Sequence, residues 1–220
     1  MATFVLFARA LAVLLYLSPI GKMHEQLPGW AETPEARLHR YYSIALDTAV
    51  VADEVCRGNR ACAVNVIHMA LGVAWHESGF APDVDLGPCY RGADGKGPRC
   101  DGGDAHSMWQ LHSMSCVTGP NAPPGPCAES VLYDTDRRAA MREALKRMRR
   151  SIHECQHALV PKEDWYAVYA GGGCKLETAV LRSHELVGSI ARARRAPDLP
   201  AAPVAPVTVT APVAEVAVLP

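Results

Sequence analysis

The sequence predicts a mainly α-helical domain that is held together by disulfide bonds. Several segments carry apolar residues at helical spacing, no segment alternates like a half-buried strand, and all eight cysteines lie in the middle of the chain. A chain of 220 residues is long enough for one domain with a core and flanking tails. The formal net charge of −1 argues against a strong general attraction to nucleic acid or to an anionic membrane.

The N-terminal segment is apolar and carries a single charge, Arg9. Its uninterrupted apolar run from Ala10 to Leu17 suits the core of a signal peptide and is shorter than the roughly 20 residues that a membrane span needs. We therefore expect residues 1–22 to be a signal peptide or an N-terminal anchor, followed by a linker over residues 23–32. A buried amphipathic helix is the alternative interpretation of the same pattern.

The domain is expected to span residues 33–195 and to begin with two helices. In the first, over residues 32–56, Thr33 suits the N-cap and Pro34 suits the first helical position. Residues 62–77 are strongly apolar, which predicts a second helix at the centre of the domain.

A third helix is predicted over residues 136–159, and shorter helices over residues 164–170 and 175–194. The third helix carries one apolar stripe at spacings of three and four, formed by Met141, Leu145, Met148, Ile152, Cys155 and Leu159. Residues 81–106 are rich in Gly, Pro and Asp and contain two cysteines, which predicts a long loop clipped by disulfides. Residues 196–220 are rich in Pro, Ala and Val, which predicts a disordered C-terminal tail.

The cysteines indicate the compartment. They are Cys56, Cys62, Cys89, Cys100, Cys116, Cys127, Cys155 and Cys174. An even number confined to the folded part predicts up to four disulfides and an oxidising environment outside the cytoplasm. Their spacing leaves the pairing open, although Cys56 with Cys62 and Cys89 with Cys100 are the nearest local pairs. The chain has no close C-x-x-C pairs of the kind that form zinc sites, and we expect no metal or cofactor.

The stretch AWHESGF places Glu77 where the apolar second helix ends. The negative end of the helix dipole and the loss of solvation both favour a protonated carboxyl group at such a position. A protonated acid can donate its proton to a leaving oxygen, which is the step that cleavage of a glycosidic bond requires. Taken alone, the same position also suits a solvated helix end.

Two later stretches fit a glycan-binding cleft. HSMWQLHS contains Trp109 and Gln110, and WYAVYAGGGC places Tyr169 before Gly171 and Gly172. Aromatic rings can stack on sugar faces, and a Gln amide can bind hydroxyl and N-acetyl groups. Glycines allow a polymer to approach the backbone closely. All five residues are candidates for substrate binding.

These three stretches, in this order, resemble the motifs of the soluble lytic transglycosylase family in the goose-type lysozyme superfamily. The family patterns are E-S-G-F, then G-x-M-Q, then Y-N-A-G, and the chain has ESGF, SMWQ and YAGGG. The resemblance covers roughly residues 60–190, with residues 86–104 as an insertion outside it. The chain departs from the family at Ser107, where Gly is usual, at Trp109, where Met is usual, and at Ala170, where Asn is usual.

The resemblance implies a lysozyme-like helical fold that acts on peptidoglycan glycan strands. With the apolar leader and the cysteines, we expect an exported monomer, periplasmic or extracellular. Glu77 would be the single acid/base that cleaves the β-1,4 bond between N-acetylmuramic acid and N-acetylglucosamine and forms a 1,6-anhydro sugar. Ser78 would orient Glu77 or contact the substrate, Gln110 would bind an N-acetyl group or a hydroxyl, and Tyr169 would hydrogen-bond near the glutamate.

Two alternatives keep the same cleft. A muramidase that hydrolyses the bond by inversion would need a second carboxylate about 6.5–9.5 Å from the first to activate water. The loop after Glu77 offers five candidates for it: Asp83, Asp85, Asp94, Asp101 and Asp104. A non-catalytic module that only binds glycan would need no second carboxylate.

HECQH matches the zinc-protease pattern H-E-x-x-H and gives a third, less favoured alternative. On a helical wheel, His153 and His157 lie away from the apolar stripe, on a face shared with basic side chains that would repel Zn²⁺. Cys155 points towards the core, where it suits a disulfide. A zinc protease acting through His153, Glu154 and His157 is therefore the weakest of the enzyme interpretations.

Overall fold

A computed structural model of the chain describes residues 2–21, 32–85, 105–112 and 128–199. Helices dominate it, so the predicted mainly α fold is confirmed. The helices are α1 (Ala2–Leu17), α2 (Pro34–Cys56), α3 (Arg60–Ser78), α4 (Pro82–Asp85), α6 (Ala128–Thr135), α7 (Arg137–His157), α8 (Ala167–Gly171) and α9 (Glu177–Arg194), with a 3₁₀ turn, η1, at Lys162–Asp164. Most of the predicted clipped loop and of the predicted tail lies outside the described residues.

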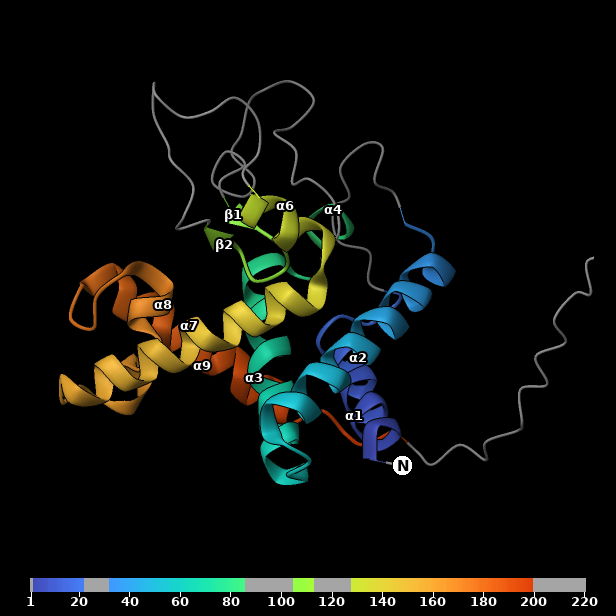
Figure 1. Cartoon of the computed structure of the whole chain (residues 1–220), viewed down its shortest axis with the longest axis horizontal. Helices are drawn as coiled ribbons and strands as arrows, with labels where there is room; N and C mark the ends of the chain where they lie inside the picture. The colour runs from blue at the N-terminus through green and yellow to red at the C-terminus, as the bar shows by residue number, and fades with distance from the viewer. Residues whose placement is uncertain (1, 22–31, 86–104, 113–127, 200–220) are drawn as a thin grey trace, which may run out of the picture.

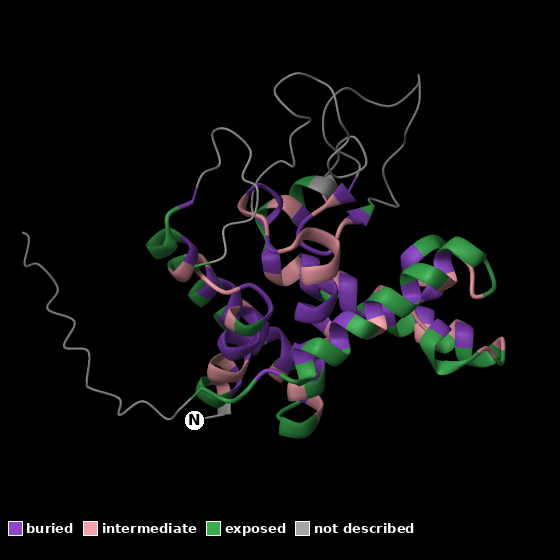
Figure 2. Ribbon diagram, turned by 180° about the vertical axis from the view of Figure 1, so that it is seen from behind, coloured by how far each residue is buried: buried purple, intermediate pink, exposed green. Residues whose placement is uncertain are grey.

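Helix α3 occupies the middle of the molecule, with α1 and α2 on one side and α7, α8 and α9 on the other (Figure 1). It is almost entirely buried along its central turns (Figure 2), as its apolar sequence predicts. At Gly72 it approaches α9 so closely that a Cβ atom would lie 2.8 Å from the Cα of Ile190. A small residue is therefore required where these two helices cross.

Local chemistry defines the start of α2 and the turn between α2 and α3. Thr33 caps α2 as predicted, because its hydroxyl accepts from the backbone N–H of Ala36 at 3.2 Å. Asn59 caps α3 by accepting from the backbone N–H of Cys62 at 3.0 Å. A disulfide between Cys56 and Cys62 spans the turn, so this predicted local pair is confirmed.

Helix α1 belongs to the same core as α2, α3 and α9. The side chains that it buries there are Leu6, Ala10, Leu11, Val13, Leu14 and Leu17. Its one charge, Arg9, donates to His68 of α3 and to the carbonyl of Ala196 at 2.7 Å. In the full chain α1 packs as the buried-helix alternative describes, and Ala196 also belongs to this core. A signal peptide or anchor over residues 1–22 and the domain boundaries at residues 33 and 195 stay predictions. None of the helices in the described ranges is both long and apolar enough to cross a bilayer.

A buried ionic network holds α4 against α2 and α7. Arg137 of α7 donates to both carboxylate oxygens of Asp85, at 2.8 and 2.9 Å, and also binds Asp47. Arg40 of α2 binds Glu32 at 2.6 Å and lies 3.6 Å from Asp85. Each buried charge therefore has an opposite charge beside it, which is the condition for burying it at acceptable cost.

A short hairpin follows α4 in the described chain. Strand β1 (Ala105–His106) pairs antiparallel with β2 (Leu111–His112), although no strand was expected. Strands of two residues are too short to show any alternating pattern. The turn between them places Ser107 at φ 61° and Gln110 at φ 49°, both in the left-handed region.

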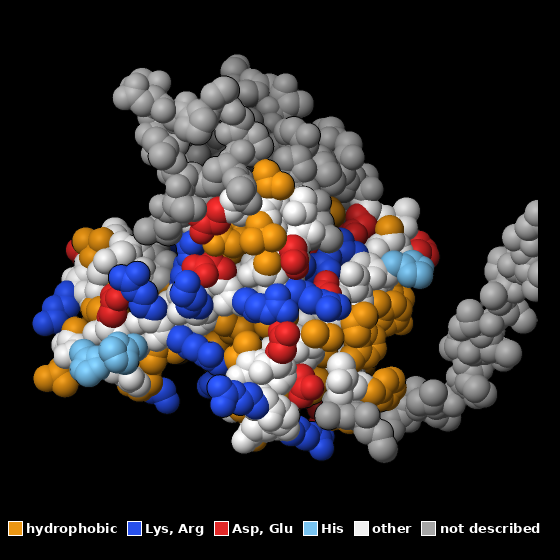
Figure 3. Space-filling model, viewed as in Figure 1, with side chains coloured by type: hydrophobic (Ala, Val, Ile, Leu, Met, Phe, Trp, Pro, Cys, Tyr) orange, Lys and Arg blue, Asp and Glu red, His pale blue; other side chains and the backbone are white. Residues whose placement is uncertain are grey.

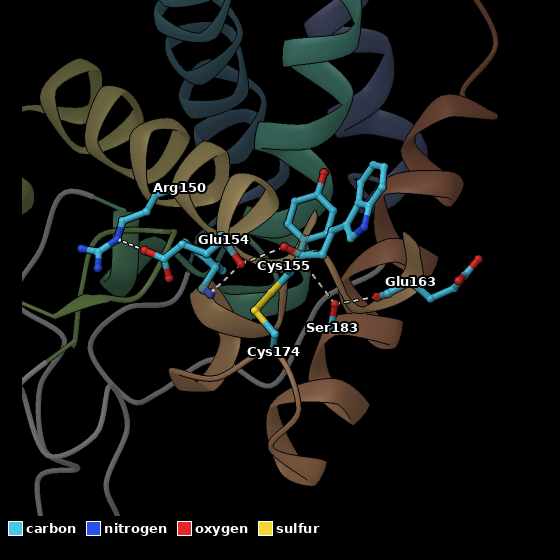
Figure 4. The surroundings of a disulfide bond; sticks show 10 residues. Arg150, Glu154, Cys155, Glu163, Cys174 and Ser183 are labelled. Carbon is cyan, nitrogen blue, oxygen red and sulfur yellow. Dashed lines mark hydrogen bonds and ion pairs between the residues drawn. A yellow bond between two sulfur atoms is a disulfide. The ribbon is translucent and has the colours of Figure 1, made fainter. Parts of the chain in front are cut away.

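Helices α7, α8 and α9 are joined by a disulfide and by two buried hydroxyls. The disulfide links Cys155 of α7 to Cys174 and is drawn with its surroundings in Figure 4. Ser151 donates to the carbonyl of Trp165 at 2.8 Å, and Ser183 donates to that of Glu163 at 2.6 Å. These contacts fix the segment that carries Tyr169.

The C-terminal end of α7 differs from the prediction. The helix ends at His157 instead of Leu159, and Leu159 adopts φ 56° with 91% of its surface exposed. The predicted stripe is buried at Met141, Leu145, Met148 and Cys155, but Leu159 does not belong to it. The left-handed turn that ends the helix directs this side chain away from the core.

Candidate active site

Glu77 lies in the last turn of α3, just before Gly79 closes the helix in a left-handed conformation. Its side chain is only 7% exposed despite this terminal position. Arg182 of α9 donates to its Oε2 atom at 3.1 Å. Glu77 is thus a largely buried, ion-paired carboxyl group and not a solvated helix end.

Ser78 serves the backbone of its own helix end. Its hydroxyl donates to the carbonyl of Ala74 at 2.7 Å and accepts from the N–H of Phe80 at 3.2 Å. A serine hydroxyl has only one proton to donate. The predicted orientation of Glu77 by Ser78 is therefore not what the structure contains, and the orienting contact comes from Arg182.

The ring of Trp109 is a core side chain, which corrects the prediction that it stacks on sugar. Only 1% of its surface is exposed, and its indole N–H donates to the carbonyl of Ala70 in α3 at 2.9 Å. The ring packs in the core between the hairpin and α3. Its backbone carbonyl, however, faces the candidate site and binds Tyr169.

Tyr169 connects the second and third motifs. Its hydroxyl donates to the carbonyl of Trp109 at 2.8 Å, and its backbone N–H donates to Ser151 at 3.0 Å. Burial raises the pKa of Tyr169 well above its usual value, and the negative charge of Glu77 adds to this rise. The hydroxyl therefore stays protonated at physiological pH and lies within electrostatic range of Glu77.

Gln110 is positioned by the same turn as Trp109. Its side-chain N–H group donates to the carbonyl of Ser107 at 3.1 Å, and the residue is partly exposed. Ser107 stands where the resembled family usually has Gly, and its positive φ explains why Gly is suited to that position.

The two glycines proposed to admit the substrate have local structural roles. Gly172 ends α8 at φ 89°, where its N–H donates to the carbonyl of Val168 at 3.0 Å. A Cβ atom on Gly171 would lie 2.9 Å from the Cβ of Ala179, so this glycine allows α8 to pack on α9. Both glycines are exposed, but neither conformation requires a ligand to explain it.

Two of the candidate second carboxylates lie in the described residues, and one of them is held in an ion pair. Asp83 and Asp85 are both buried, and Asp85 is bound by Arg137 through both of its oxygens. A carboxylate that is fully engaged in a buried ion pair cannot act as a base for water. The prediction is therefore corrected for Asp85. The other three, Asp94, Asp101 and Asp104, lie outside the described residues.

The H-E-x-x-H segment does not form the expected ligand set. His153 and His157 are exposed with their Nε2 atoms 3.1 Å apart, while Glu154 is paired with Arg150 at 2.6 Å and Cys155 is in a disulfide. Figure 4 shows both the Glu154 pair and the disulfide. Within residues 2–21, 32–85, 105–112 and 128–199, no group of three or more His, Cys, Asp or Glu side chains could hold a metal ion.

The predicted basic face of α7 is balanced by acidic partners. Figure 3 shows Lys and Arg side chains interleaved with Asp and Glu over the face that includes α2 and α7. The pairs are Arg138 with Asp47, Arg142 with Glu54, Lys146 with Glu143, Arg147 with Glu143, and Arg150 with Glu154. This face is therefore of mixed charge.

All cysteines in the described ranges are paired: Cys56 with Cys62, and Cys155 with Cys174. The second pair was not predicted, because eight cysteines allow many pairings and these two are far apart in sequence. Cys89, Cys100, Cys116 and Cys127 lie outside the described residues. Disulfides are typical of proteins in oxidising compartments, which agrees with the expected export.

Arg182 is the site residue that the sequence did not reveal. It belongs to no recognisable motif, it lies 105 residues from Glu77 along the chain, and only the packing of α9 on α3 brings the two together.

Comparisons with protein-family models, with curated proteins and with solved structures found no match. Function is therefore inferred from the geometry of the site and the motifs that form it.

Proposed function

We propose that the protein is an exported lytic transglycosylase that cleaves peptidoglycan glycan strands with Glu77 as its acid/base. One observation carries the proposal: residues from three separate motifs converge on one place. The hydroxyl of Tyr169 donates to the carbonyl of Trp109, next to Gln110 in the chain. The negative charge of Glu77 also contributes to the raised pKa of Tyr169. Motifs that resemble those of one family in order along the chain are thus also neighbours in space.

In the proposed reaction, protonated Glu77 donates its proton to the glycosidic oxygen as the bond to C1 of the muramyl residue breaks. The resulting carboxylate then takes the proton of the C6 hydroxyl, whose oxygen attacks C1. The product is a 1,6-anhydromuramyl end and no water is consumed. One carboxyl group performs both steps, so the reaction needs no partner for Glu77 among the loop aspartates.

The residues around Glu77 support this chemistry in different ways. Burial of its side chain strengthens the electrostatic effect of any nearby charge or dipole. Tyr169 is a protonated donor whose position is fixed through both its hydroxyl and its backbone N–H. Gln110 carries its amide group on a partly exposed turn beside it, where the N–H group donates to the carbonyl of Ser107.

Hydrolysis with a second carboxylate is less well supported, because Asp85 is committed to Arg137. A module that only binds glycan would use the same residues but would leave the burial of Glu77 without a chemical purpose. Both alternatives are distinguished from the proposal by the products.

The test is mass spectrometry of purified peptidoglycan incubated with the full chain. We expect products with 1,6-anhydromuramic ends. Glu77→Gln should lower the rate by about 10²–10⁴-fold, since general acid catalysis contributes that much. Glu54→Gln is the matched control, because it makes the same change in an exposed Glu–Arg pair distant from the motifs.

Three results would contradict the proposal in different ways. Reducing muramic ends would mean hydrolysis. Full activity of Glu77→Gln would remove Glu77 from the mechanism. Binding of glycan without any cleavage would indicate a binding module.

A further inference from the structure

The ion pair between Glu77 and Arg182 joins the candidate acid to a residue that no motif contains. The guanidinium Nη2 atom lies 3.1 Å from Oε2 of the carboxylate. The two partners differ in exposure, since the Glu77 side chain is 7% exposed and that of Arg182 is 52% exposed. The carboxylate is therefore held inside the site by a cation that stands at its rim.

We propose that Arg182 is a positioning residue, which keeps Glu77 ionised and fixed in the free protein and thereby sets the pH range over which Glu77 can donate a proton. The inference rests on the proposed function, because it assigns a regulator to the same acid. It also makes a claim about the free protein that can be measured without any substrate.

Opposing effects act on the carboxyl group of Glu77. Its place at the C-terminal end of α3 and the burial of its side chain both favour the neutral acid. A guanidinium within hydrogen-bond distance favours the carboxylate instead. An arginine cannot relieve this by losing its own proton, so the charge of Arg182 acts at every physiological pH.

Other titratable and charged groups lie near the Glu77–Arg182 pair. Tyr169 of α8 is neutral, because burial raises its pKa well above the usual value. Arg147 of α7 is within range of Tyr169, but it is bound by Glu143 at 2.9 Å. On α3 itself, burial lowers the pKa of His76, whose ring lies 3.7 Å from Glu185 of α9.

The first measurement is an NMR titration of the full chain labelled with ¹³C in the Glu carboxyl groups, with the Glu77 signal assigned by its loss in Glu77→Gln. We expect Arg182→Gln to raise the titration midpoint of Glu77 by about 1–3 pH units. Arg182→Lys should keep most of the wild-type midpoint, because it keeps the charge. Arg150→Gln, which breaks another exposed Arg–Glu pair, should leave the midpoint unchanged.

An unchanged midpoint in Arg182→Gln would overturn the inference, and so would a lysine variant that behaves like the glutamine variant. Because Arg182 is half exposed, these variants are expected to fold, and Arg182→Met gives a second neutral side chain for the same comparison. A midpoint that rises in both neutral variants supports the role of charge and not of one particular substitution.

The second measurement is the pH dependence of kcat/KM on purified peptidoglycan. An acid must be protonated to act, so kcat/KM falls as the pH rises through the midpoint of Glu77. We expect this alkaline fall to move upwards in Arg182→Gln by the same amount as the NMR midpoint, and not to move in Arg150→Gln. A profile that stays in place while the midpoint moves would overturn the regulatory role.

The two failures can be told apart. If wild-type protein does not cleave peptidoglycan, the proposed function fails, while the NMR midpoint still decides what Arg182 does to Glu77. If wild-type protein cleaves, Glu77→Gln does not, and the midpoint ignores Arg182, only the further inference fails.

Discussion

His68 shows how a single buried side chain makes the fold sensitive to acid. It accepts hydrogen bonds from Arg9 of α1 at 2.8 and 3.0 Å through Nε2, which requires a neutral ring. Burial, followed by the positive charges of Arg9 and Arg194, lowers its pKa from 6.5 to about 4. The folded protein therefore binds a proton at His68 less readily than the unfolded chain does.

This predicts a loss of stability in acid. The contribution of neutral His68 to the unfolding free energy is complete above pH 6.5. It declines as the pH falls towards about 4, because in that window His68 is protonated only in the unfolded chain. When the pH is lowered from 7.5 to 4.5, the unfolding free energy of both proteins falls. We expect the fall to be about 2 kcal/mol smaller in His68→Gln than in the wild type, because glutamine does not titrate. Urea denaturation at the two pH values measures this, and equal losses in both proteins would contradict it.

At the scale of residues, the sequence was informative where chemistry is local. Thr33 and the Cys56–Cys62 bridge depend on neighbours within a few positions, and both were predicted correctly. Arg182 was not found, because nothing in its local sequence distinguishes it from any exposed arginine. Trp109 was placed wrongly at the surface, because an aromatic residue next to a binding motif suits a core equally well.

At the scale of elements, α1 is the clearest case in which one pattern suits two structures. An apolar N-terminal run with a single charge fits a leader peptide, and it also fits a helix that buries one face. The contacts of Arg9 with His68 and Ala196 show how the helix packs in the full chain, and the sequence could not supply them. A leader over residues 1–22 stays a prediction. The two-residue strands and the short helices α4 and α6 were missed because they are too brief for any periodic signal.

The packing of α1 predicts a large effect from one truncation. Leu14 is fully buried, so Leu14→Ala should destabilise the full chain by about 2–5 kcal/mol. Phe4 of the same helix is 61% exposed, and Phe4→Ala should change the unfolding free energy by less than about 1 kcal/mol. Denaturant titration of both variants provides the comparison. A Leu14→Ala protein as stable as the wild type would mean that α1 is not part of the core.

The crossing of α3 and α9 gives a second prediction, with a matched control on the same pair of helices. Gly72→Ala should cost about 1–3 kcal/mol, because its Cβ would meet the backbone of Ile190 at 2.8 Å and neither helix can yield without the other. Gly188→Ala in α9 meets no atom within 4 Å and should stabilise the protein by up to about 1 kcal/mol. Thermal unfolding measures both, and a neutral Gly72→Ala would refute the close approach.

At the scale of the whole molecule, the candidate site is assembled from parts of the chain that only the tertiary fold brings together. Glu77 comes from α3, Trp109 and Gln110 from the hairpin, Tyr169 from α8 and Arg182 from α9. The motifs identified most of these residues, because each motif preserves local chemistry. How they meet, and which cation faces the acid, depends on helix crossings that no local pattern encodes.

The position of α1 also has a consequence for the order of synthesis. This helix leaves the ribosome long before its partners in α9 and at Ala196. At about 5–20 residues per second, roughly ten seconds or more separate the two events. Throughout that interval part of an apolar helix stays uncovered, open to any cellular factor that recognises nascent apolar segments, so its folding competes with its capture while the chain is still being made.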